Sequence, residues 1–394
     1  MTDAPGLQWV QSASEATAYT RLGALSGKTL AQAIAYCDVT PPWSQMRRCN
    51  LLDNGAVSAF YNGGAGCYSD TDVATRGQVM VDIECFDYYT DFSTPGTYIW
   101  YIQPHGADMT VGGSAVTWNT HPAFIRNGVT KDRIFLSAYE AYLNGTKLES
   151  KAGVQPTASQ TIAQFRAAAQ ARVGGVANKW EQQDYLTTCA VQLLYLLEYG
   201  GFNSQTLLSA GITNAHNDGD HNQASNTGHT TTLGNASGQV LHTFDHVPDS
   251  GATTGYAMSY RGIENLYGNL YKFVDGLHID ANYTPFIADH GFNDIFPSNT
   301  PYVASTATPL IDADGFVTDI KVDATYDYGF LPSAVGGSAA TKLCDYYYCM
   351  AGNKIAAYGG NWAYINFAGA FYWHFAFTVA ASFVSIGARL EYIG

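Results

Sequence analysis

The sequence predicts an α+β fold in which two helices pack on a sheet. Residues 77–102 contain two runs rich in β-branched and aromatic residues, QVMVDIECFDYY and TYIWYIQP, which are typical of neighbouring strands. Two later stretches, 157–171 and 180–199, repeat apolar residues every three or four positions, as helices do. Hydrophobic residues make up 46% of the 394 residues and charged residues only 13%, which favours a compact, loop-rich protein over disorder.

The first 75 residues are rich in turns. A short helix is expected around Lys28 to Tyr36, and clusters of Gly, Pro, Asn and Asp interrupt the rest, as in YNGGAGCYSD. Arg47 and Arg48 are expected to pair with acidic neighbours. A phosphate clamp is the alternative, but no Gly-rich loop lies near them.

The next predicted strand is DRIFLSAYE, which places Ile134 and Leu136 on one face and Phe135 on or near the other. Glu140 lies at its end. A structural hydrogen-bond acceptor is the favoured role for Glu140, with a catalytic carboxylate as the alternative.

Two helices follow. Thr157 and Ser159 are candidate N-caps of the first, which is expected to run through Ala171. The second is expected from about Trp180 to Tyr199, where a Gly pair stops it. Cys189 falls in its apolar stripe and is therefore expected to fill the core rather than to act as a nucleophile.

Residues 212–259 are poor in apolar side chains and are expected to form a long structured loop. Candidate metal ligands gather in it: His216, Asp218, Asp220, His221 and His229. The pattern lacks the closing acidic residue of a calcium loop, so chance clustering in a polar loop is the favoured interpretation. We therefore expect no metal and no other cofactor. Just beyond this loop, Arg261 and Glu264 are expected to pair with each other.

Charge and cysteine content restrict the partners and the compartment. The net charge of −14 argues against binding to nucleic acid or to an anionic membrane. The opening MTDAPGLQWV lacks the features of a secretion signal, and the chain has no apolar run of about 18 residues, so membrane insertion is not expected. The cysteines form no CxxC pair and are expected to be mostly reduced and buried in a protein made in the cytoplasm: Cys37, Cys49, Cys67, Cys85, Cys189, Cys344 and Cys349.

The last stretch, 359–394, mixes two kinds of residue. One kind is typical of a stiff framework: Gly359, Gly360, Trp362, Gly369, Phe371, Trp373, Gly387 and Arg389. The residues between them share no chemistry, which no catalytic site requires and which suits a binding face. A pair of amphipathic core strands is the alternative, and it explains the large aromatic framework residues well.

From residue 76 to the end, the chain resembles the variable proteins of diversity-generating retroelements. The resemblance rests on HPAFIRNG, AYE, LLYLLEYGGFNSQ, TLGNASG, SYRGIENLYGN with KFVDGL, LPSAVGGS, and the terminal GGNW, AGAFYW and IGARL. It implies a C-type-lectin fold of the formylglycine-generating-enzyme type, with two helices on a twisted, mainly antiparallel sheet and long loops. A small β- and turn-rich region would precede that domain.

In that family, error-prone copying at adenines scatters AAC or AAT codons into many amino acids but never into Lys, Gln, Glu, Met or Trp. The irregular terminal residues obey this restriction. The resemblance therefore implies that they are the variable, ligand-binding positions: Ala363, Tyr364, Ile365, Asn366, Phe367, His374, Ala376, Phe377, Ala381, Phe383 and Ser385.

The resemblance implies a function in host recognition and no enzyme activity. Residues 76–394 would be a lectin-like domain with a hypervariable segment, 359–393, that binds a protein or glycan receptor on a host cell. Residues 1–75 would attach the protein to other tail or virion proteins. A homotrimer at a phage tail tip or fibre is expected, made in the bacterial cytoplasm, with the bacterial cell surface as the alternative location.

Two alternative functions stay open. One is a formylglycine-generating type of oxidase, which relies on a Cys pair near its C-terminus. Cys344 and Cys349 precede GGNW here, whereas that branch places its thiols after the equivalent motif, so an incidental pair is favoured. The other is a structural tail protein that binds no ligand.

Overall fold

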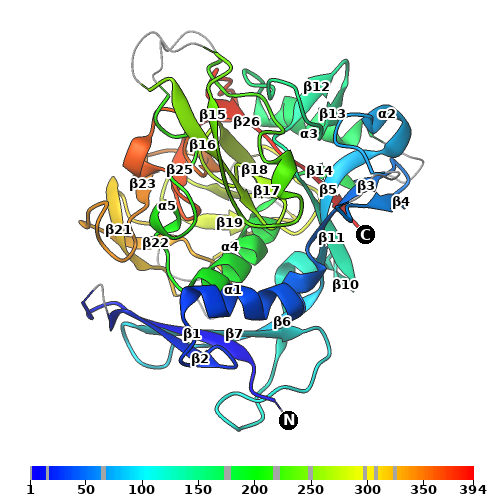
Figure 1. Ribbon diagram of the computed structural model, residues 1–394. Helices are drawn as coiled ribbons and strands as arrows, with labels where there is room; N and C mark the ends of the chain where they lie inside the picture. Colours follow the sequence, from blue (N-terminus) through cyan, green and yellow to red (C-terminus); the bar gives the residue numbers. More distant parts are fainter. Residues whose placement is uncertain are drawn as a thin grey trace.

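The computed structural model describes residues 2–14, 17–63, 68–172, 179–215, 222–246, 252–295, 300–305, 309–322 and 326–394. In these residues the fold is mainly β-sheet with few helices. Figure 1 shows helix α4 near the middle of the molecule with sheets around it. No helix in the described ranges is long and apolar enough to cross a membrane.

Helices and single helical turns connect the sheets. They are α1 (Leu30–Val39), α2 (Val73–Arg76), α3 (Ile162–Gln170), α4 (Tyr185–Tyr199), α5 (Ser204–Leu207), η2 (Trp43–Gln45), η3 (Pro122–Phe124), η4 (Thr231–Leu233) and η5 (Ile365–Phe367). Helix α1 matches the short helix expected near Lys28. Thr29 starts it with a capping box, in which its hydroxyl accepts from the Gln32 backbone N–H.

Helix α3 begins later than the sequence suggested. Its N-cap is Thr161, whose hydroxyl accepts from the backbone N–H of Gln164 at 3.2 Å. The two expected caps serve elsewhere. The Thr157 hydroxyl accepts from the Leu143 backbone N–H at 2.8 Å, and Ser159 adopts a positive φ of 60° that does not suit an N-cap.

Helix α4 begins at Tyr185, because residues 180–182 form a strand instead. The Asp184 side chain caps it by accepting from the Thr187 N–H at 2.7 Å. It ends at Gly200, which adopts a left-handed φ of 74°, as expected for a glycine C-cap. Every residue of α4 is buried, and Cys189 lies in the largest apolar core, which confirms its structural role.

Two sheets include strands from the start of the chain. The five-stranded sheet has the order β2-β1-β7-β6-β8 and consists of β1 (Pro5–Val10), β2 (Tyr19–Gly23), β6 (Phe86–Asp91), β7 (Thr97–Pro104) and β8 (Asn119–Thr120). The six-stranded sheet has the order β14-β27-β11-β5-β3-β4 and consists of β3 (Arg47–Leu51), β4 (Val57–Phe60), β5 (Gln78–Glu84), β11 (Arg133–Ser137), β14 (Trp180–Gln182) and β27 (Leu390–Ile393). In β11, Ile134 and Leu136 face one core and Phe135 faces another, as predicted.

These pairings contradict the expected domain boundary near residue 75. Strand β1 pairs with β7, and β3 pairs with β5, so both sheets cross the boundary. Trp43 of η2 donates its indole N–H to the Leu194 carbonyl of α4 at 3.0 Å. A single apolar core contains Trp9, Trp43 and Trp373. The first 75 residues are therefore part of the same folded body as the rest.

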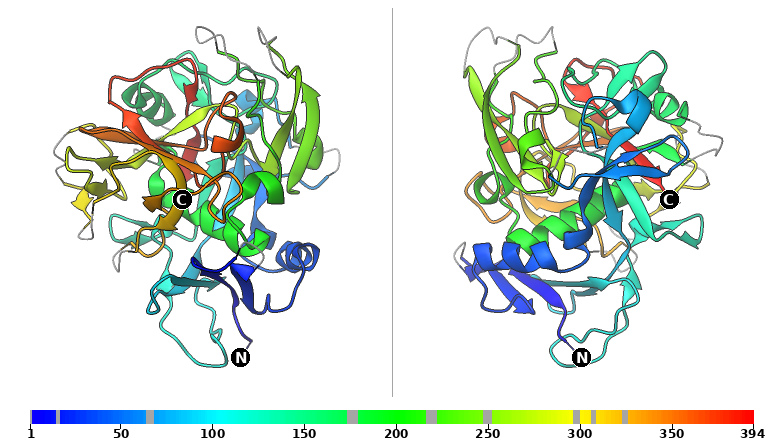
Figure 2. Two further views of the ribbon diagram at one scale, coloured as in Figure 1. Left: turned by 90° about the vertical axis from the view of Figure 1, so that its left-hand side faces the viewer. Right: turned by 45° about the vertical axis from the view of Figure 1, so that its right-hand side comes forward.

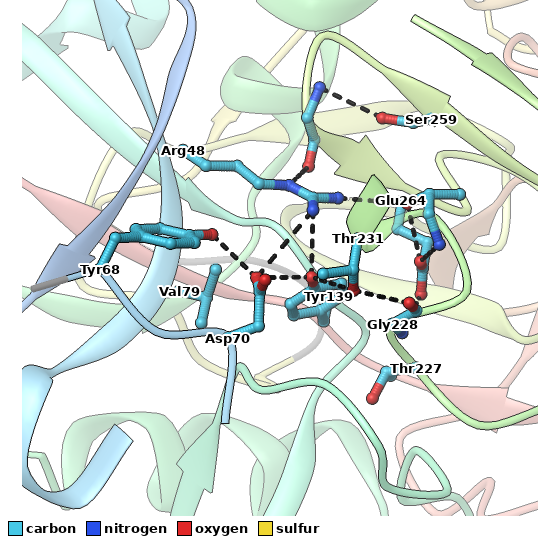
Figure 3. Close-up of polar contacts among 12 residues, drawn as sticks. Arg48, Tyr68, Asp70, Val79, Tyr139, Thr227, Gly228, Thr231, Ser259 and Glu264 are labelled. Atoms are coloured by element: carbon cyan, nitrogen blue, oxygen red, sulfur yellow. Dashed lines mark hydrogen bonds and ion pairs between the residues drawn. The ribbon is translucent and has the colours of Figure 1, made fainter. Parts of the chain in front are cut away.

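A buried polar network makes the same connection (Figure 3). The guanidinium of Arg48, on β3, donates to the Gly262 carbonyl at 2.8 Å, to the Tyr139 hydroxyl at 3.0 Å and to the Thr230 hydroxyl at 3.1 Å. Its carboxylate neighbour Asp70 is farther away, at 4.0 Å. Arg48 thus binds mainly neutral oxygens of later segments, rather than the acidic partners the sequence suggested.

The remaining strands form the half of the molecule that contains the end of the chain. The nine-stranded sheet has the order β20-β19-β18-β24-β25-β23-β21-β22, with β26 beside β18. Its strands are β18 (Tyr271–Ile279), β19 (Pro285–Ile287), β20 (Val303–Ala304), β21 (Gly315–Ile320), β22 (Pro332–Val335), β23 (Tyr346–Cys349), β24 (Lys354–Tyr358), β25 (Trp373–Phe377) and β26 (Ile386–Gly387). Most pairings are antiparallel, whereas β23–β25 and β18–β26 are parallel.

Three small sheets complete the described fold. They are β9 (Ile125–Arg126) with β10 (Val129–Thr130), β12 (Tyr142–Asn144) with β13 (Lys147–Glu149), and β15 (Gly238–Thr243), β16 (Thr254–Tyr260) and β17 (Ile263–Glu264). The β15–β16 hairpin corrects the long loop expected over 212–259. Exposure alternates along β15 because only one face of this hairpin packs on the protein, which explains its low apolar content.

Candidate ligand-binding surface

The terminal segment runs from the end of β24 through η5, β25 and β26 to β27. In the left view of Figure 2 it is orange to red and lies beside the light-green β15–β16 hairpin. All eight framework residues are buried. Gly360 illustrates why the framework is specific, because its φ is +73° and a Cβ there would come within 2.6 Å of the Ala368 Cβ.

Trp362 attaches the start of the segment to the protein. Its backbone N–H donates to the Asn269 carbonyl at 3.0 Å, and its carbonyl accepts from the Ala215 N–H at 2.8 Å. Its fully buried indole packs in a small core with Phe244 and Leu270. The loop that follows therefore starts from a fixed point.

Arg389 attaches the end of the segment. Its buried guanidinium donates to the carbonyls of Ser137 at 3.1 Å and Asn265 at 2.8 Å, and also to the Glu264 carbonyl. These carbonyls belong to β11 and to the turn after β17. A planar group with several donors is needed to join them, which favours Arg over Lys here.

Helical turn η5 presents the most exposed part of the segment. Ile365 has a positive φ of 47°, an unusual conformation for a β-branched residue that costs about 1–3 kcal/mol. Its backbone is held on both sides, since its N–H donates to the Thr213 carbonyl at 2.7 Å and its carbonyl accepts from the Gln205 side chain at 2.6 Å. Its side chain is 56% exposed. The protein thus holds an apolar side chain in solvent.

Aromatic rings form a continuous surface around this turn. We call it the aromatic surface and define it by its exposed or half-buried members: Phe316, Tyr346, Tyr348, Tyr364, Phe367, Phe377 and Phe383. Phe367 lies 4.6 Å from Tyr346 and 5.4 Å from Phe316, between ring centroids. On the other side, Phe377 lies 5.6 Å from Phe383. Contiguous apolar surface of this kind is typical of an interaction site.

Buried rings under the aromatic surface join its two sides. Tyr271 lies 5.1 Å from Tyr364 and 5.2 Å from His374, and His374 stacks on Phe377 at 4.1 Å. Burial lowers the pKa of His374 to about 3 and raises the pKa of Tyr271 well above its usual value. The floor is therefore uncharged at neutral pH and supports the exposed rings by packing.

The eleven candidate variable residues fall into three groups. Ile365, Asn366, Phe367 and Phe383 are exposed, and Ala363, Tyr364, Ala376, Phe377 and Ser385 are half-buried. His374 and Ala381 are buried, with 4% and 7% of their surface exposed. This placement corrects the expectation for these two residues. They lie under neighbouring side chains, so they shape the surface from below rather than contact a ligand.

Several residues of the aromatic surface were missed by the sequence reasoning. Tyr346 and Tyr348 belong to β23, which lies parallel to β25 in the sheet. Strand alternation in the run YYYC places these two side chains on one face, while Tyr347 and Cys349 are buried. That alternation was the available signal. Phe316 of β21 had none, because its position depends on which strands pair.

Cys344 and Cys349 are free and buried, as are the other four cysteines that the structure describes; Cys67 lies outside the described residues. Burial raises the pKa of the Cys349 thiol, and the nearby Asp314 carboxylate raises it further. A thiol in this environment is a poor nucleophile. The geometry thus gives no support to the oxidase alternative.

Two other polar residues have structural roles. Glu140 forms a buried ion pair with Lys272 at 3.0 Å and accepts from the Asn269 side chain at 2.5 Å, so its contacts are those of a structural acceptor. Arg261 does not pair with Glu264, as expected from the sequence, but with Glu198 of α4 at 2.7 Å. The chain turns between Arg261 and Glu264, and this turn separates their side chains.

The predicted metal-ligand set is only partly described. His216, Asp218, Asp220 and His221 lie outside the described residues. His229 is described, and its ring Nε2 lies 2.8 Å from an Asp245 carboxylate oxygen.

The protein also has two open cavities of about 380 and 510 Å³ that share Lys131 and Lys179 in their lining. Neither lining includes a residue of the aromatic surface. The candidate site is thus a face of the protein and not one of these cavities.

No protein-family model matches this sequence, and no curated protein matches it. Among solved structures, the Major Tropism Determinant P3c variant is 12% identical, with 89% of this chain and 82% of that chain covered and a TM-score of 0.30. The M1 variant is 11% identical, with 89% and 81% covered and a TM-score of 0.30. The I1 variant is 12% identical, with 89% and 81% covered and a TM-score of 0.31. A likeness of this size assigns no function, so the case for binding rests on the aromatic surface.

Proposed function

We propose that this protein is a receptor-binding protein that recognises a host cell through its aromatic surface. One observation carries the proposal. Exposed side chains of the terminal segment, including Phe367 and Phe383, belong to a continuous set of rings, while every framework residue between them is buried. Such a division lets binding side chains vary while the backbone stays fixed.

The chemistry of the surface fits recognition better than catalysis. Tyr and Phe rings supply large contact areas at low entropic cost and are frequent hot spots of protein recognition. Their faces also stack on the apolar faces of sugar rings. The receptor is accordingly a protein or a glycan on the host surface. The rings beneath the surface, Tyr271 and His374, are held neutral by burial and supply no charge for acid–base chemistry.

The sequence resemblance extends this proposal to diversification. On this view the exposed positions 365–367 and 383 are sampled by error-prone copying, and most surface substitutions cost within about 0.5 kcal/mol. The protein would act as a homotrimer on a phage tail tip or fibre, and several copies would add avidity. It would be made in the bacterial cytoplasm, and its N-terminal residues would contact other tail or virion proteins.

Binding to bacterial cells tests the proposal. Fluorescently labelled protein is incubated with a panel of gut bacteria, and bound label is measured by flow cytometry. A triple variant, Ile365→Ser with Phe367→Ser and Phe383→Ser, is expected to lose at least about 90% of the binding seen for the wild type, because it removes the exposed apolar anchors.

The matched control replaces exposed apolar residues elsewhere: Val39→Ser, Val129→Ser and Val303→Ser, which are 77%, 55% and 60% exposed. This control is expected to bind as the wild type does. Equal binding by the triple variant, or equal loss in the control, would contradict the proposal and favour a structural tail protein.

A further inference from the structure

Three metal-ligating side chains meet on the β15–β16 hairpin, outside the aromatic surface. His242 lies on β15, Asp245 follows that strand, and His229 comes from the turn before η4. Each offers one ligand atom, and these atoms lie within 4.8 Å of one another. The two imidazole rings stack with centroids 3.9 Å apart, and His229 Nε2 lies 2.8 Å from Asp245 Oδ2.

The state of these groups suits metal binding. Burial lowers the pKa of His242 to about 4, so its ring is neutral at physiological pH and keeps a lone pair. Its buried Nδ1 has no hydrogen-bond partner, while its Nε2 lies 3.1 Å from the Ser225 hydroxyl. The side chains of His229 and Asp245 are 24% and 25% exposed, so water can reach the cluster.

We propose that His229, His242 and Asp245 bind one divalent transition-metal ion, with Zn²⁺ as the best fit. Two imidazole nitrogens and one carboxylate oxygen are ligands that zinc prefers, and a water molecule would complete the tetrahedron. Calcium and magnesium need more oxygen ligands than this cluster contains. Ligand atoms around tetrahedral zinc lie about 3.3 Å apart, so small side-chain rotations would bring these three atoms into place.

The site lies where a metal ion would reinforce the support of the terminal segment. The His242 ring contacts the Ser225 hydroxyl, and the Ser225 backbone N–H donates to the Asn269 side chain at 2.9 Å. The Asn269 carbonyl in turn accepts from the Trp362 N–H at 3.0 Å. Zinc would join the hairpin to the turn at His229 and thereby hold the residues on which Trp362 rests.

The test uses the full chain without an affinity tag, treated with EDTA and then titrated with Zn²⁺ or Co²⁺. We expect one ion per chain by calorimetry and visible absorption bands of tetrahedral Co²⁺. The thermal unfolding midpoint is expected to rise by about 3 °C when zinc is at 100 times its dissociation constant. Asp245→Asn and His242→Gln are each expected to remove these effects.

The matched control is His105→Gln. His105 also pairs with a carboxylate, Asp87 at 2.6 Å, but it lies outside the three-residue cluster. This variant is expected to bind zinc as the wild type does. Absence of cobalt bands and of a zinc-dependent midpoint shift in the wild type would overturn the proposal, as would full binding by Asp245→Asn.

Circular dichroism shows whether each variant folds. Asp245 is partly exposed, so its amide variant should keep the fold even if His242→Gln does not. Together with the cobalt spectrum of the wild type, the Asp245→Asn result then decides the question alone. This test is independent of receptor binding, because it needs no host cell.

Discussion

The Cα of Gly369 lies directly against the buried carboxylate of Asp345. A Cβ at position 369 would come within 2.1 Å of both carboxylate oxygens. Asp345 cannot move away freely, since it is short, buried and accepts from the Phe371 backbone N–H at 2.7 Å. This contact explains why a glycine stands at this position of the framework.

Gly369→Ala is therefore expected to destabilise the protein by more than about 2 kcal/mol, because the new methyl group overpacks a rigid site. Urea denaturation followed by tryptophan fluorescence measures the change. Ala380→Ser, at an exposed position of the same segment, is the control and should leave the free energy of unfolding unchanged within about 0.5 kcal/mol. A loss no larger for Gly369→Ala than for the control would contradict this account.

Asp345 also predicts a pH dependence. Burial raises its pKa from 3.8 to about 7, although the hydrogen bond from the Phe371 N–H opposes the shift. Between about pH 4 and 7 the folded protein keeps this proton and the unfolded chain does not. The contribution of Asp345 to stability is thus fully present below pH 4 and is lost as the pH rises towards 7, by at most about 1.4 kcal/mol per pH unit.

Other buried carboxyls, including Glu181 and Asp275, have pKa values raised in the same direction, so the wild-type curve alone does not isolate Asp345. Asp345→Asn does. The stability of the wild type relative to this variant is expected to fall between pH 4 and 7, as measured by urea denaturation at each pH. Parallel curves for the two proteins would show that Asp345 titrates normally.

A chain that starts at residue 76 is expected not to fold. It would lose β1 and β3, which pair with β7 and β5, and it would expose the core that contains Trp373. Expression followed by near-ultraviolet circular dichroism and thermal unfolding tests this. A soluble product with a cooperative transition near that of the full chain would instead support an independent N-terminal region.

The sequence predicted local structure better than long-range pairing. The Gly200 stop and the two faces of β11 follow from nearest neighbours and strand alternation, and both were correct. The start of α4 was wrong because residues 180–182 gain more from pairing with β27, more than 200 residues away, than from a further helical turn. The boundary at residue 75 failed for the same reason, since turn-rich composition does not show which strands pair.

For the binding surface, the sequence separated buried framework residues from the others but did not give their depth. His374 and Phe377 look alike in the pattern, yet His374 is covered by Tyr348 and Phe377 and lies over Tyr271. The partners from β18, β21 and β23 come from distant parts of the chain, so no local pattern could assign them to one surface.

The central claim is that the framework carries stability and the exposed side chains carry specificity. Its most direct test compares the thermal unfolding midpoints of two variants. The triple variant Ile365→Ser, Phe367→Ser, Phe383→Ser is expected to unfold within about 3 °C of the wild type. Trp362→Ala, which empties a buried framework position, is expected to lose about 3–5 kcal/mol and to unfold at a much lower temperature. A fall for the triple variant as large as that for Trp362→Ala would contradict the account, because the exposed residues would then be part of the core.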